Sequence, residues 1–368
     1  MQPGGRRAEG DQVLEDLDHA VLGDWLADHL DGVTAVHVDR TELPDGGFSG
    51  ETTILQVSVV RHGDESTERY VLRREPSEAA VYPAQAPGLN VEVDVQWRVM
   101  HAVRDHGGLP VAPTVGYEPD PAVLGVPFFV TGFVVGDVPR ETPAYPAEGF
   151  YADATPERRR AMNLVGARTV AAVNRMDWRA AGLDFLVPDG AVPDNHRQLG
   201  LWRSWSDGQL RGRAHPVLEE AWSLLAATVR PGDEPVVCWG DCRLGNVFWD
   251  GAQPVCLTDF EGATIAPAGF DLGWFLMFDR WIHEACGNPR LDGEPSRTEL
   301  VEAHEEALGR PVADLDWHEV FAAARYCAIV VRVINRMEER GQLSAGTDTY
   351  LAGGVTDCLR LLLEEGRL

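Results

Sequence analysis

The sequence predicts an α+β protein in two unequal parts, a small β-rich N-terminal part and a larger, mostly helical C-terminal part. Three observations lead to this class. Short β-rich runs joined by glycine-bearing or polar turns gather in the first part of the chain. Helical patterns dominate from about residue 155 onward. The chain has 368 residues, which is long for one compact domain and natural for two lobes.

The N-terminal part is expected to begin with a helix and a hairpin. Residues 14–30 carry apolar side chains at helical spacing, which predicts an amphipathic helix. A turn with Gly46, Gly47 and Gly50 then leads into a β-rich run at 52–60, and the polar turn RHGDEST leads to a second run, ERYVLRR. We therefore expect a strand–turn–strand hairpin with a glycine loop at its mouth.

A second helix is expected from about residue 90 to residue 106. Gln96 lies on the same side of this helix as its apolar stripe, which holds Val99, Met100 and Val103. Gln96 should therefore face inward, with Glu92 one turn earlier on that side. Two short strands should follow, near residues 114–117 and 127–135.

The boundary between the two parts is expected near residues 131–136, because a Pro-, Gly- and Tyr-rich connector follows at 139–154. Residues 1–133 would then form an N-terminal lobe with the first helix, the glycine loop and the sheet. Residues 134–368 would form a C-terminal lobe that is helical apart from one β-rich stretch, 236–259.

Charge and composition narrow the function classes. Acidic residues outnumber basic ones 58 to 32, which gives a formal net charge of −26. Such a surface repels phosphate backbones and anionic lipids, so we expect neither nucleic acid nor a membrane as partner. All the basic residues are arginines, and without lysine the chain cannot form a Schiff base with its own side chain.

Cysteine usage and hydropathy favour a reduced cytoplasm. The six cysteines are scattered without a C-x-x-C pair, so neither a zinc site nor a disulfide framework is indicated. The first residues, MQPGGRRAEGDQ, lead into an acidic helical pattern with no apolar signal-peptide core. No apolar stretch approaches the length of about 18 residues needed to span a bilayer. The oligomeric state is left open.

The residues that carry chemistry lie in the β-rich stretch and just after it. Asn246 follows Asp241 by five residues, and Asp259 follows Asn246 by thirteen. Two short β runs around a turn at Asp250 and Gly251 separate Asn246 from Asp259, so a hairpin would bring these two side chains together. An amide oxygen and a carboxylate are hard ligands suited to Mg²⁺ with bound phosphates. Asp241 can then accept a proton from an incoming hydroxyl.

These residues resemble a known family. The segment WGDCRLGN (239–246) is similar to the H-G-D-x-x-x-x-N catalytic loop of aminoglycoside phosphotransferases and choline-kinase-like enzymes. TDFEGA (258–263) resembles their metal-binding aspartate segment, and FDLGWFL (270–276) resembles the helix that follows it. The resemblance implies a two-lobed protein-kinase-like fold with a nucleotide-binding N-terminal lobe and an acceptor pocket in the helical lobe.

The same resemblance implies roles for individual residues in an ATP-dependent transfer to a small-molecule hydroxyl. Asp241 corresponds to the catalytic base, Asn246 and Asp259 to the Mg²⁺ ligands, and Asp271 to the aspartate that holds the catalytic loop. The adenine would bind backbone groups in the segment Thr131, Gly132 and Phe133. The flap over the phosphates would be formed by Gly46, Gly47, Phe48 and Ser49.

Two positions depart from the family pattern. The phosphate-pairing lysine of the second hairpin strand is replaced by Arg73, and its helix partner, usually glutamate, by Gln96. Arginine can still hold phosphate, in a bidentate manner. Strand alternation puts Arg73 and Arg74 on opposite faces, and the family pattern implies that Arg73 points into the cleft and Arg74 toward solvent. The histidine of the catalytic loop is replaced by Trp239, at a position that supports packing and hydrogen bonding.

Two questions stay open at the level of sequence. The acceptor is an aminoglycoside-like polyamine, a hydroxyacyl-CoA or another alcohol. Candidates for its pocket are the tryptophans at 202, 205, 274 and 281 and the acidic Glu261, Asp279 and Glu284, with Arg158–Arg160, Arg203, Arg211 and Arg213 as a basic mouth. The alternative to an enzyme is a pseudokinase that binds nucleotide without transfer. Retention of Asp241, Asn246 and Asp259 favours the enzyme.

Overall fold

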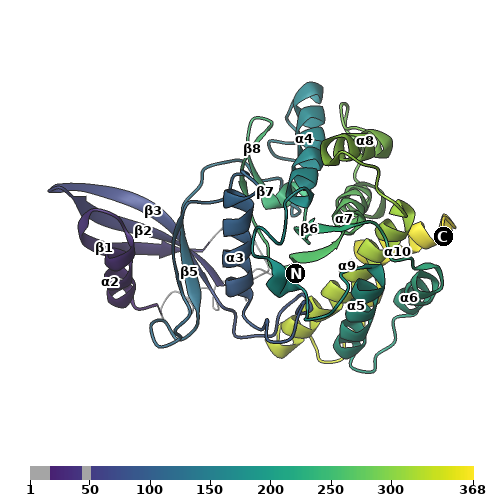
Figure 1. Cartoon of the computed structure of the whole chain (residues 1–368), viewed down its shortest axis with the longest axis horizontal. Coiled ribbons are helices and arrows are strands. Elements are labelled where there is room, and N and C mark those ends of the chain that lie inside the picture. The colour runs from purple at the N-terminus through teal and green to yellow at the C-terminus, as the bar shows by residue number, and fades with distance from the viewer. Residues whose placement is uncertain (1–16, 44–50) are drawn as a thin grey trace. The chain divides into compact units, whose positions relative to one another are not determined.

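The computed structural model describes residues 17–43 and 51–368, which form two compact units. The N-terminal unit comprises the described residues up to Ala80 together with Asn90–Arg98 and Ala112–Val135, and the C-terminal unit comprises Val81–Leu89, Val99–Val111 and Gly136–Leu368. The predicted α+β class is confirmed, because a five-stranded antiparallel sheet is followed by a mostly helical region (Figure 1).

The sheet of the N-terminal unit has the strand order β1-β2-β3-β5-β4. Its strands are β1 (Val33–Glu42), β2 (Glu51–Arg61), β3 (Asp64–Arg74), β4 (Thr114–Glu118) and β5 (Phe128–Gly132). The predicted hairpin is confirmed as β2–β3, with Arg61 opposite Asp64 and left-handed backbone at His62 and Gly63 in the turn. Strand β1 was not predicted. Within it Val38 is the buried residue, so the strand shows no clear alternation of apolar side chains.

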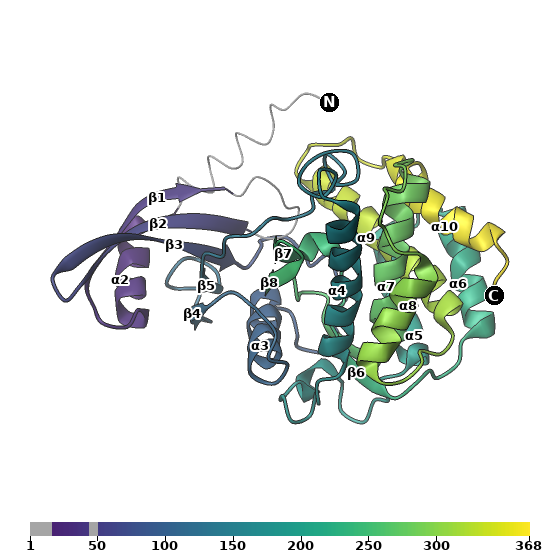
Figure 2. The same cartoon turned by 90° about the horizontal axis from the view of Figure 1, so that it is seen from above.

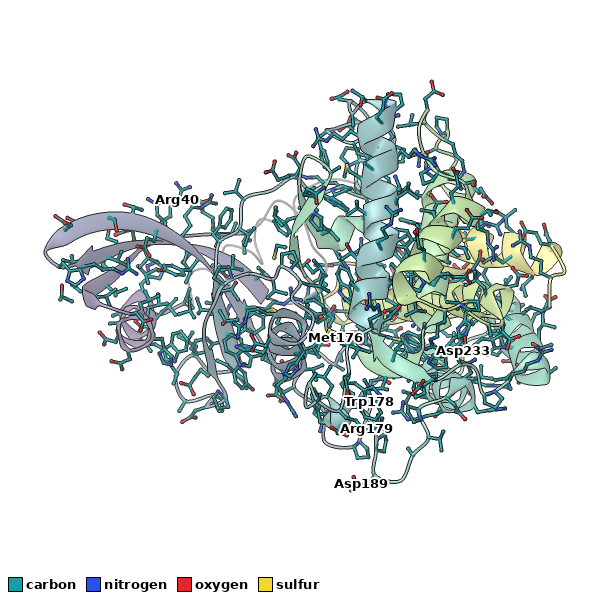
Figure 3. All side chains as sticks on the ribbon, turned by 45° about the horizontal axis from the view of Figure 1, so that its top comes forward. Arg40, Met176, Trp178, Arg179, Asp189 and Asp233 are labelled. Carbon is teal, nitrogen blue, oxygen red and sulfur yellow. The ribbon has the colours of Figure 1, made fainter. Side chains whose placement is uncertain are left out.

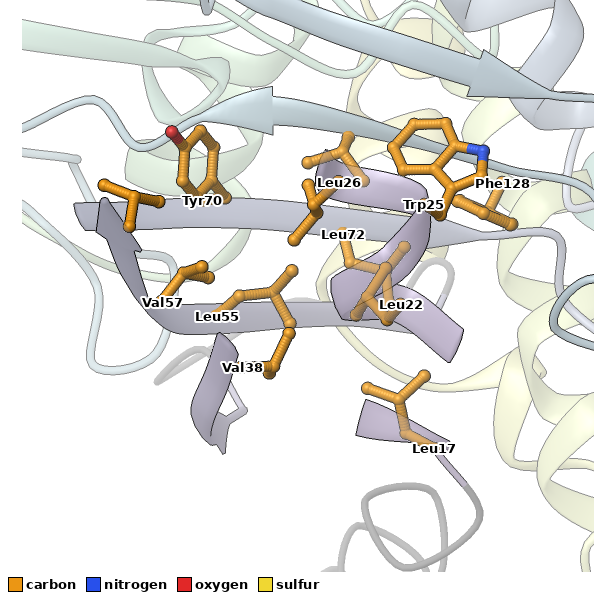
Figure 4. Close-up of a cluster of buried hydrophobic side chains, with 12 residues drawn as sticks. Leu17, Leu22, Trp25, Leu26, Val38, Leu55, Val57, Tyr70, Leu72 and Phe128 are labelled. Carbon is orange, nitrogen blue, oxygen red and sulfur yellow. The ribbon is translucent and has the colours of Figure 1, made fainter. Parts of the chain in front are cut away.

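Helix α2 (His19–His29) covers the hydrophobic core of this sheet. Asp18 caps the helix by accepting hydrogen bonds from the backbone N–H groups of Ala20 and Val21. Leu22 and Leu26 pack with Leu55 and Leu72 of the central strands (Figure 4). Each such fully buried side chain contributes roughly 1.5–3 kcal/mol. This core therefore fixes which face of β3 is covered by the helix.

Helix α3 (Glu92–Asp105) confirms the second predicted helix. Its N-terminus is capped from a distant strand end, because the Glu75 carboxylate accepts hydrogen bonds from the backbone N–H groups of Glu92 and Val93, at 3.0 and 2.9 Å. Gln96 is buried, 3% exposed, as its place beside the apolar stripe predicted. The residues of α3 up to Arg98 belong to the N-terminal unit and the rest to the C-terminal unit.

The C-terminal unit is built around the 25-residue helix α9 (Leu315–Glu339), which is buried along most of its length. Figures 1 and 2 show α7 beside α9 and α4 beside α8, and these pairs pack directly. The other helices are α4 (Pro156–Asn174), α5 (Asn195–Leu210), α6 (Pro216–Thr228), α7 (Gly269–Arg280), α8 (Arg297–Leu308) and α10 (Gly354–Glu364). None of the helices in the described part of the chain has the length and apolar character that a bilayer crossing requires.

Short elements connect these helices. The antiparallel pairs are β6 (Pro235–Cys238) with β9 (Thr264–Pro267) and β7 (Val247–Asp250) with β8 (Gln253–Leu257). Single helical turns are η1 (Asp184–Leu186), η2 (Leu244–Asn246), the π-helical turn η3 (Trp281–Ala285) and η4 (Thr349–Leu351). In the loop after α4, the Arg179 guanidinium lies 3.8 Å from the Trp178 ring centre, as a cation–π contact (Figure 3).

Candidate active site

Asp271, in the first turn of α7, anchors the loop that carries Asp241. Its carboxylate accepts hydrogen bonds from the backbone N–H groups of Trp239 and Gly240, at 2.7 and 2.9 Å. Asn174 donates a third hydrogen bond from its amide nitrogen, at 2.9 Å. Burial raises the pKa of Asp271, and the two backbone N–H groups oppose that rise. The loop is thus held from behind by a fully buried carboxyl group.

Gly240 shows why this loop needs glycine next to Asp241. Its φ is +90°, and a Cβ atom added there would lie 1.9 Å from the backbone oxygen of Gly262. Both the left-handed backbone and this close approach exclude any side chain. The Gly-Asp pair therefore places Asp241 on a tight turn against the segment that follows Asp259.

The predicted hairpin between Asn246 and Asp259 is present as β7–β8. Val247 pairs with Leu257, and the backbone N–H of Thr258 donates to the oxygen of Asn246 at 3.0 Å. Asp259 follows directly and is one of the few described non-glycine residues with positive φ, +58°. Such a strained conformation persists only where surrounding contacts impose it.

Trp239 supplies those contacts. Its indole N–H donates to the backbone oxygens of Thr258 and Asp259, at 2.8 and 3.1 Å, and its ring stacks on Phe260. A histidine at this position has a ring N–H that can donate in the same way. The tryptophan therefore retains a hydrogen-bond donor to the backbone of the Asp259 segment, although the side chain is larger.

Asp241 is buried, 7% exposed, and surrounded by donors. Oδ1 accepts from the indole N–H of Trp274 at 2.9 Å, and Oδ2 accepts from the amide of Asn246 at 2.8 Å. The Nε–H of Arg243 lies 3.1 and 3.3 Å from the two oxygens, and Tyr82 contributes a further side-chain hydrogen bond. Burial, aided by the nearby charge of Asp259, raises the pKa of Asp241 to about 7 although these hydrogen bonds lower it. A carboxyl with that pKa can exchange a proton near neutral pH.

Asn246 and Asp259 fit a role as metal ligands. The Asn246 amide nitrogen donates to the backbone oxygen and to Oδ2 of Asp241, both at 2.8 Å. The side-chain oxygen of Asn246 is on the other side of the amide group and is the atom that can bind a metal ion. Mg²⁺ takes one or two protein oxygens together with substrate phosphates. Within residues 17–43 and 51–368, no group of three or more His, Cys, Asp and Glu side chains offers a metal site of its own.

The structure corrects one prediction in the N-terminal unit. Arg74 was expected to face solvent, but it is only 7% exposed, because it shares a face of β3 with the buried Tyr70 and Leu72. Arg73 lies on the other face, is half-buried, and interacts electrostatically with the carboxylate of Glu75. The alternation itself is as predicted.

The structure describes the segment predicted to bind adenine but not the predicted flap. Thr131 is buried in β5, and the N–H groups of Gly132 and Phe133 donate to the backbone oxygens of Pro113 and Arg69, at 2.7 and 3.1 Å. These two N–H groups are thus engaged within the protein. The predicted flap residues Gly46, Gly47, Phe48 and Ser49 lie outside the described residues.

A pocket adjoins the Asp241 loop within the C-terminal unit. Its volume of ≈ 20 Å³ is enough for about one water molecule. Arg243 and Glu141, which form an ion pair, lie in its wall. The remaining lining includes the aromatic Tyr145, Phe275, Phe278 and Trp281 and one further carboxylate, Asp279. Of the predicted acceptor residues, Asp279 and Trp281 are therefore here, whereas Trp274 contacts Asp241 itself.

The other predicted acceptor residues have different surroundings. Trp202 is buried against Trp205 and Tyr82, and Glu284 pairs with Arg280. The arginines proposed as a basic mouth are engaged by the protein. Arg159 is buried and donates to backbone oxygens of Tyr151, Ala152, Ala154 and Asp292, and the others bind carboxylates such as Glu299, Glu219, Glu339 and Glu338.

Sequence reasoning missed several residues that complete the site. Arg243 stands two residues after Asp241, so its position carried a local signal. Tyr82, Glu141 and Asn174 come from distant segments, and nothing in the sequence ties them to the loop. Only the folded chain brings them to the loop, where Tyr82 bonds Asp241, Asn174 donates to Asp271 and Glu141 pairs with Arg243.

The fold and the loop geometry define a kinase-like phosphotransferase. Residues 55–304 match the model of the phosphotransferase enzyme family, and the chain belongs to this family. The family resemblance predicted from the WGDCRLGN loop is thereby confirmed.

Known proteins agree on the fold. The structure of a "putative aminoglycoside phosphotransferase" from Ralstonia eutropha JMP134 is 22% identical, with a TM-score of 0.67 over 95% of this chain and 97% of that one. Spectinomycin phosphotransferase, solved with ADP and spectinomycin, is 9% identical with a TM-score of 0.51, covering 95% of this chain and 99% of that one.

A curated relative is longer. "Probable acyl-CoA dehydrogenase IBR3" of Arabidopsis thaliana is 29% identical over 358 residues, which cover 91% of this chain and 41% of that protein. The chain thus spans about two fifths of the length of that relative.

Proposed function

We propose that this chain is an ATP-dependent kinase that transfers the γ-phosphoryl group of ATP to a hydroxyl group of a small molecule. One observation carries the proposal. Asp241, Asn246 and Asp259 lie on one loop and the hairpin that follows it: the Asn246 amide donates to the Asp241 carboxylate, and the indole N–H of the buried Trp239 donates to the backbone oxygen of Asp259. In phosphoryl transfer, catalysis consists mainly of positioning and charge stabilisation, which such a rigid arrangement supplies.

Each residue has a distinct part in the proposed reaction. Asp241 orients the acceptor hydroxyl and receives its proton. Asn246 and Asp259 hold Mg²⁺, which when bound would neutralise charge on the nucleotide phosphates. Arg73 of the N-terminal unit holds a phosphate oxygen in place of the lysine that the chain lacks. The ADP in the solved spectinomycin phosphotransferase supports a nucleotide as the second substrate of this fold.

The wall of the pocket beside the Asp241 loop, which has room for about one water molecule, favours as acceptor a substrate that is at least partly apolar or cationic. Phe278 and Trp281 offer ring faces, whereas the carboxylates of Asp279 and Glu141 are already paired with Arg290 and Arg243. Such a wall suits an amine-bearing alcohol. This matches the aminoglycoside-like acceptor that the family resemblance implies.

A second acceptor class has its own support. The long Arabidopsis relative is named an acyl-CoA dehydrogenase, which favours a hydroxyacyl-CoA as acceptor. A cavity of ≈ 220 Å³ in the C-terminal unit shares Asp279 with the pocket beside the Asp241 loop. Its lining includes Arg280, Arg290, Arg297 and Arg367, each paired with a carboxylate, and the acidic Glu284 and Glu365. Guanidinium groups are suited to the phosphates of coenzyme A.

A transfer assay separates these possibilities. The chain with ATP and Mg²⁺ is incubated with amine-bearing sugars, simple alcohols and hydroxyacyl-CoA thioesters, and mass spectrometry detects acceptors that gain one phosphoryl group. The proposal predicts one productive class and none with Asp241→Asn. ATP binding without transfer to any class, in wild type as in Asp241→Asn, would instead indicate a pseudokinase.

A further inference from the structure

The carboxylate of Asp241 has no vacant site for an incoming hydroxyl. A carboxylate offers about four lone-pair positions. Trp274, Asn246 and Tyr82 each direct a donor at it, and the Nε–H of Arg243 lies near both oxygens, at 3.1 and 3.3 Å. An acceptor hydroxyl can therefore reach the base only by displacing one of these donors.

Three of the four donors are poorly placed to leave. Trp274 is 1% exposed and packs among aromatic rings. Asn246 is 3% exposed, and its amide also bonds the backbone of Asp241, so moving it would disturb the turn η2. Neither these two residues nor Tyr82 belongs to the wall of the acceptor pocket, whereas Arg243 does.

Arg243 also has a second anion to go to. Its Nη1 forms an ion pair with Glu141, and its guanidinium carbon lies 5.2 Å from the Phe278 ring centre. Both side chains of the ion pair are partly accessible, 23% for Arg243 and 27% for Glu141. Gly245 leaves the room for this arrangement, because a Cβ atom there would lie 3.1 Å from Arg243 Nη1. Displacing Arg243 from Asp241 therefore leaves the guanidinium paired with Glu141.

We infer that Arg243 covers the catalytic carboxylate in the absence of acceptor, and that Glu141 retains the guanidinium when the acceptor hydroxyl takes its place. Arg243 and Glu141 are thus positioning residues that control access to Asp241. The inference rests on the proposed kinase function. Its consequence is that water is kept from the base while Arg243 covers it, so ATP is conserved until an acceptor binds.

Hydrolysis of ATP without acceptor tests this inference. In that reaction a water oxygen bonds to the γ-phosphorus, the bond from that phosphorus to the β,γ-bridging oxygen breaks, and Asp241 takes a proton from the water. ADP and inorganic phosphate are released. Arg243→Met should raise the turnover number for hydrolysis about tenfold, because one charge-assisted hydrogen bond to the base is lost. Glu141→Gln should not raise it, because the guanidinium then has Asp241 as its remaining anionic partner.

The distinguishing result is that hydrolysis of ATP rises in Arg243→Met but not in Glu141→Gln. If the ion pair were merely structural, its loss would change hydrolysis in the same direction in both variants. Arg243→Lys should stay near wild type, and the double variant Asp241→Asn with Arg243→Met should lose the gain. Arg168→Met, which removes the surface contact with Glu306, serves as the matched control. If Arg243→Met does not fold, as thermal melting would reveal, Arg243→Gln replaces it.

Calorimetric titration with ATP and Mg²⁺ accompanies every variant. Hydrolysis that falls or stays unchanged in folded, ATP-binding Arg243→Met overturns the inference and leaves the proposed kinase function standing. A rise in both Arg243→Met and Glu141→Gln also overturns it. Absence of ATP binding in wild type refutes the kinase function, and the inference falls with it.

Discussion

The catalytic loop of the C-terminal unit and strand β3 of the N-terminal unit each depart from the family motif at one position, with different consequences. Trp239 stands where the family has histidine, and its indole N–H still donates to the backbone beside Asp259. Arg73 stands where the family has lysine, on a half-buried strand face near Glu75. The tryptophan at 239 keeps a hydrogen bond within the protein. The arginine at 73 replaces the point charge of an ammonium group by a planar guanidinium group, whose proposed partner is a ligand.

The difference teaches which substitutions can be interpreted from the folded chain itself. The loop is fixed by Asp271 and by the β7–β8 hairpin, so the purpose of Trp239 is visible in its contacts. The purpose of Arg73 depends on a nucleotide, so it has to be measured.

Replacing Asp241 by asparagine should have the largest effect. The amide cannot take a proton from the acceptor, so the rate of transfer should fall by about 10²–10⁴. ATP binding should change little, because Asp241 acts on the acceptor and not on the nucleotide. Thermal stability should fall, because the amide nitrogen of asparagine would face either the Trp274 N–H or the Asn246 amide, both of which are donors. Single-turnover kinetics with an accepted substrate provide the measurement. Turnover near that of wild type would remove Asp241 from the role of base.

Acid should destabilise the C-terminal unit through its buried histidines. Burial lowers the pKa of His215 and His304 to about 4 and of His318 to about 3. Below pH 6.5 these histidines therefore bind protons in the unfolded chain but stay neutral in the folded one. Each histidine then lowers the free energy of unfolding by about 1.4 kcal/mol for every pH unit. The raised pKa values of Asp241 and Asp271 act in the opposite direction. We expect a net loss on the order of 2–3 kcal/mol between pH 6.5 and 5, measured by urea denaturation.

His304 links this pH dependence to the catalytic loop. Its Nε2 lies 3.0 Å from the side-chain oxygen of Asn174, whose amide donates to Asp271. His304→Gln should reduce the slope of stability against pH by about 1.4 kcal/mol per unit. An unchanged slope would show that His304 does not titrate as its burial implies. The control is His196→Gln, because His196 is an exposed histidine of α5 and its replacement should leave the slope unchanged.

Trp239→Phe tests the donor in the loop. Phenylalanine keeps the stacking on Phe260 but leaves the oxygens of Thr258 and Asp259 without the indole N–H, which should cost about 1–3 kcal/mol of stability. Trp239→His restores a ring donor and should retain more activity than Trp239→Phe. If the two variants lose activity equally, ring volume rather than the hydrogen bond sets the role of Trp239.

The two arginines of β3 should separate binding from stability. Arg73→Ala should weaken ATP use by about 1–3 kcal/mol with little change in melting temperature. Arg74→Ala should instead lower the stability, by about 1–3 kcal/mol, since Arg74 is buried beside Leu72. The Michaelis constant for ATP and the melting temperature of each variant are the readouts. Loss of ATP affinity in Arg74→Ala alone would place the phosphate contact on the other strand face.

The sequence predicted best what is local. The turn at Asp250 and Gly251 between two β runs was sufficient to place Asn246 beside the Asp259 segment, because hairpin register follows from the turn. Strand β1 was not predicted, because most of its side chains are exposed and its apolar residues do not alternate clearly. Arg74 was misplaced because its face was taken as solvent-facing, although Tyr70 and Leu72 share it. Tyr82 and Glu141 reach the loop only through tertiary folding, which no spacing reveals.

Calorimetric titration of wild type and Asp259→Ala with ATP in saturating Mg²⁺ tests the central claim most directly, that this loop and hairpin form a magnesium–nucleotide site. Asp259 adds a carboxylate beside Asn246, and without Mg²⁺ that charge would face the triphosphate unscreened. The account predicts that wild type binds ATP tightly only with Mg²⁺, and that Asp259→Ala loses the dependence on Mg²⁺ and at least about tenfold in affinity. Equal ATP affinity for the two proteins in saturating Mg²⁺ would contradict it.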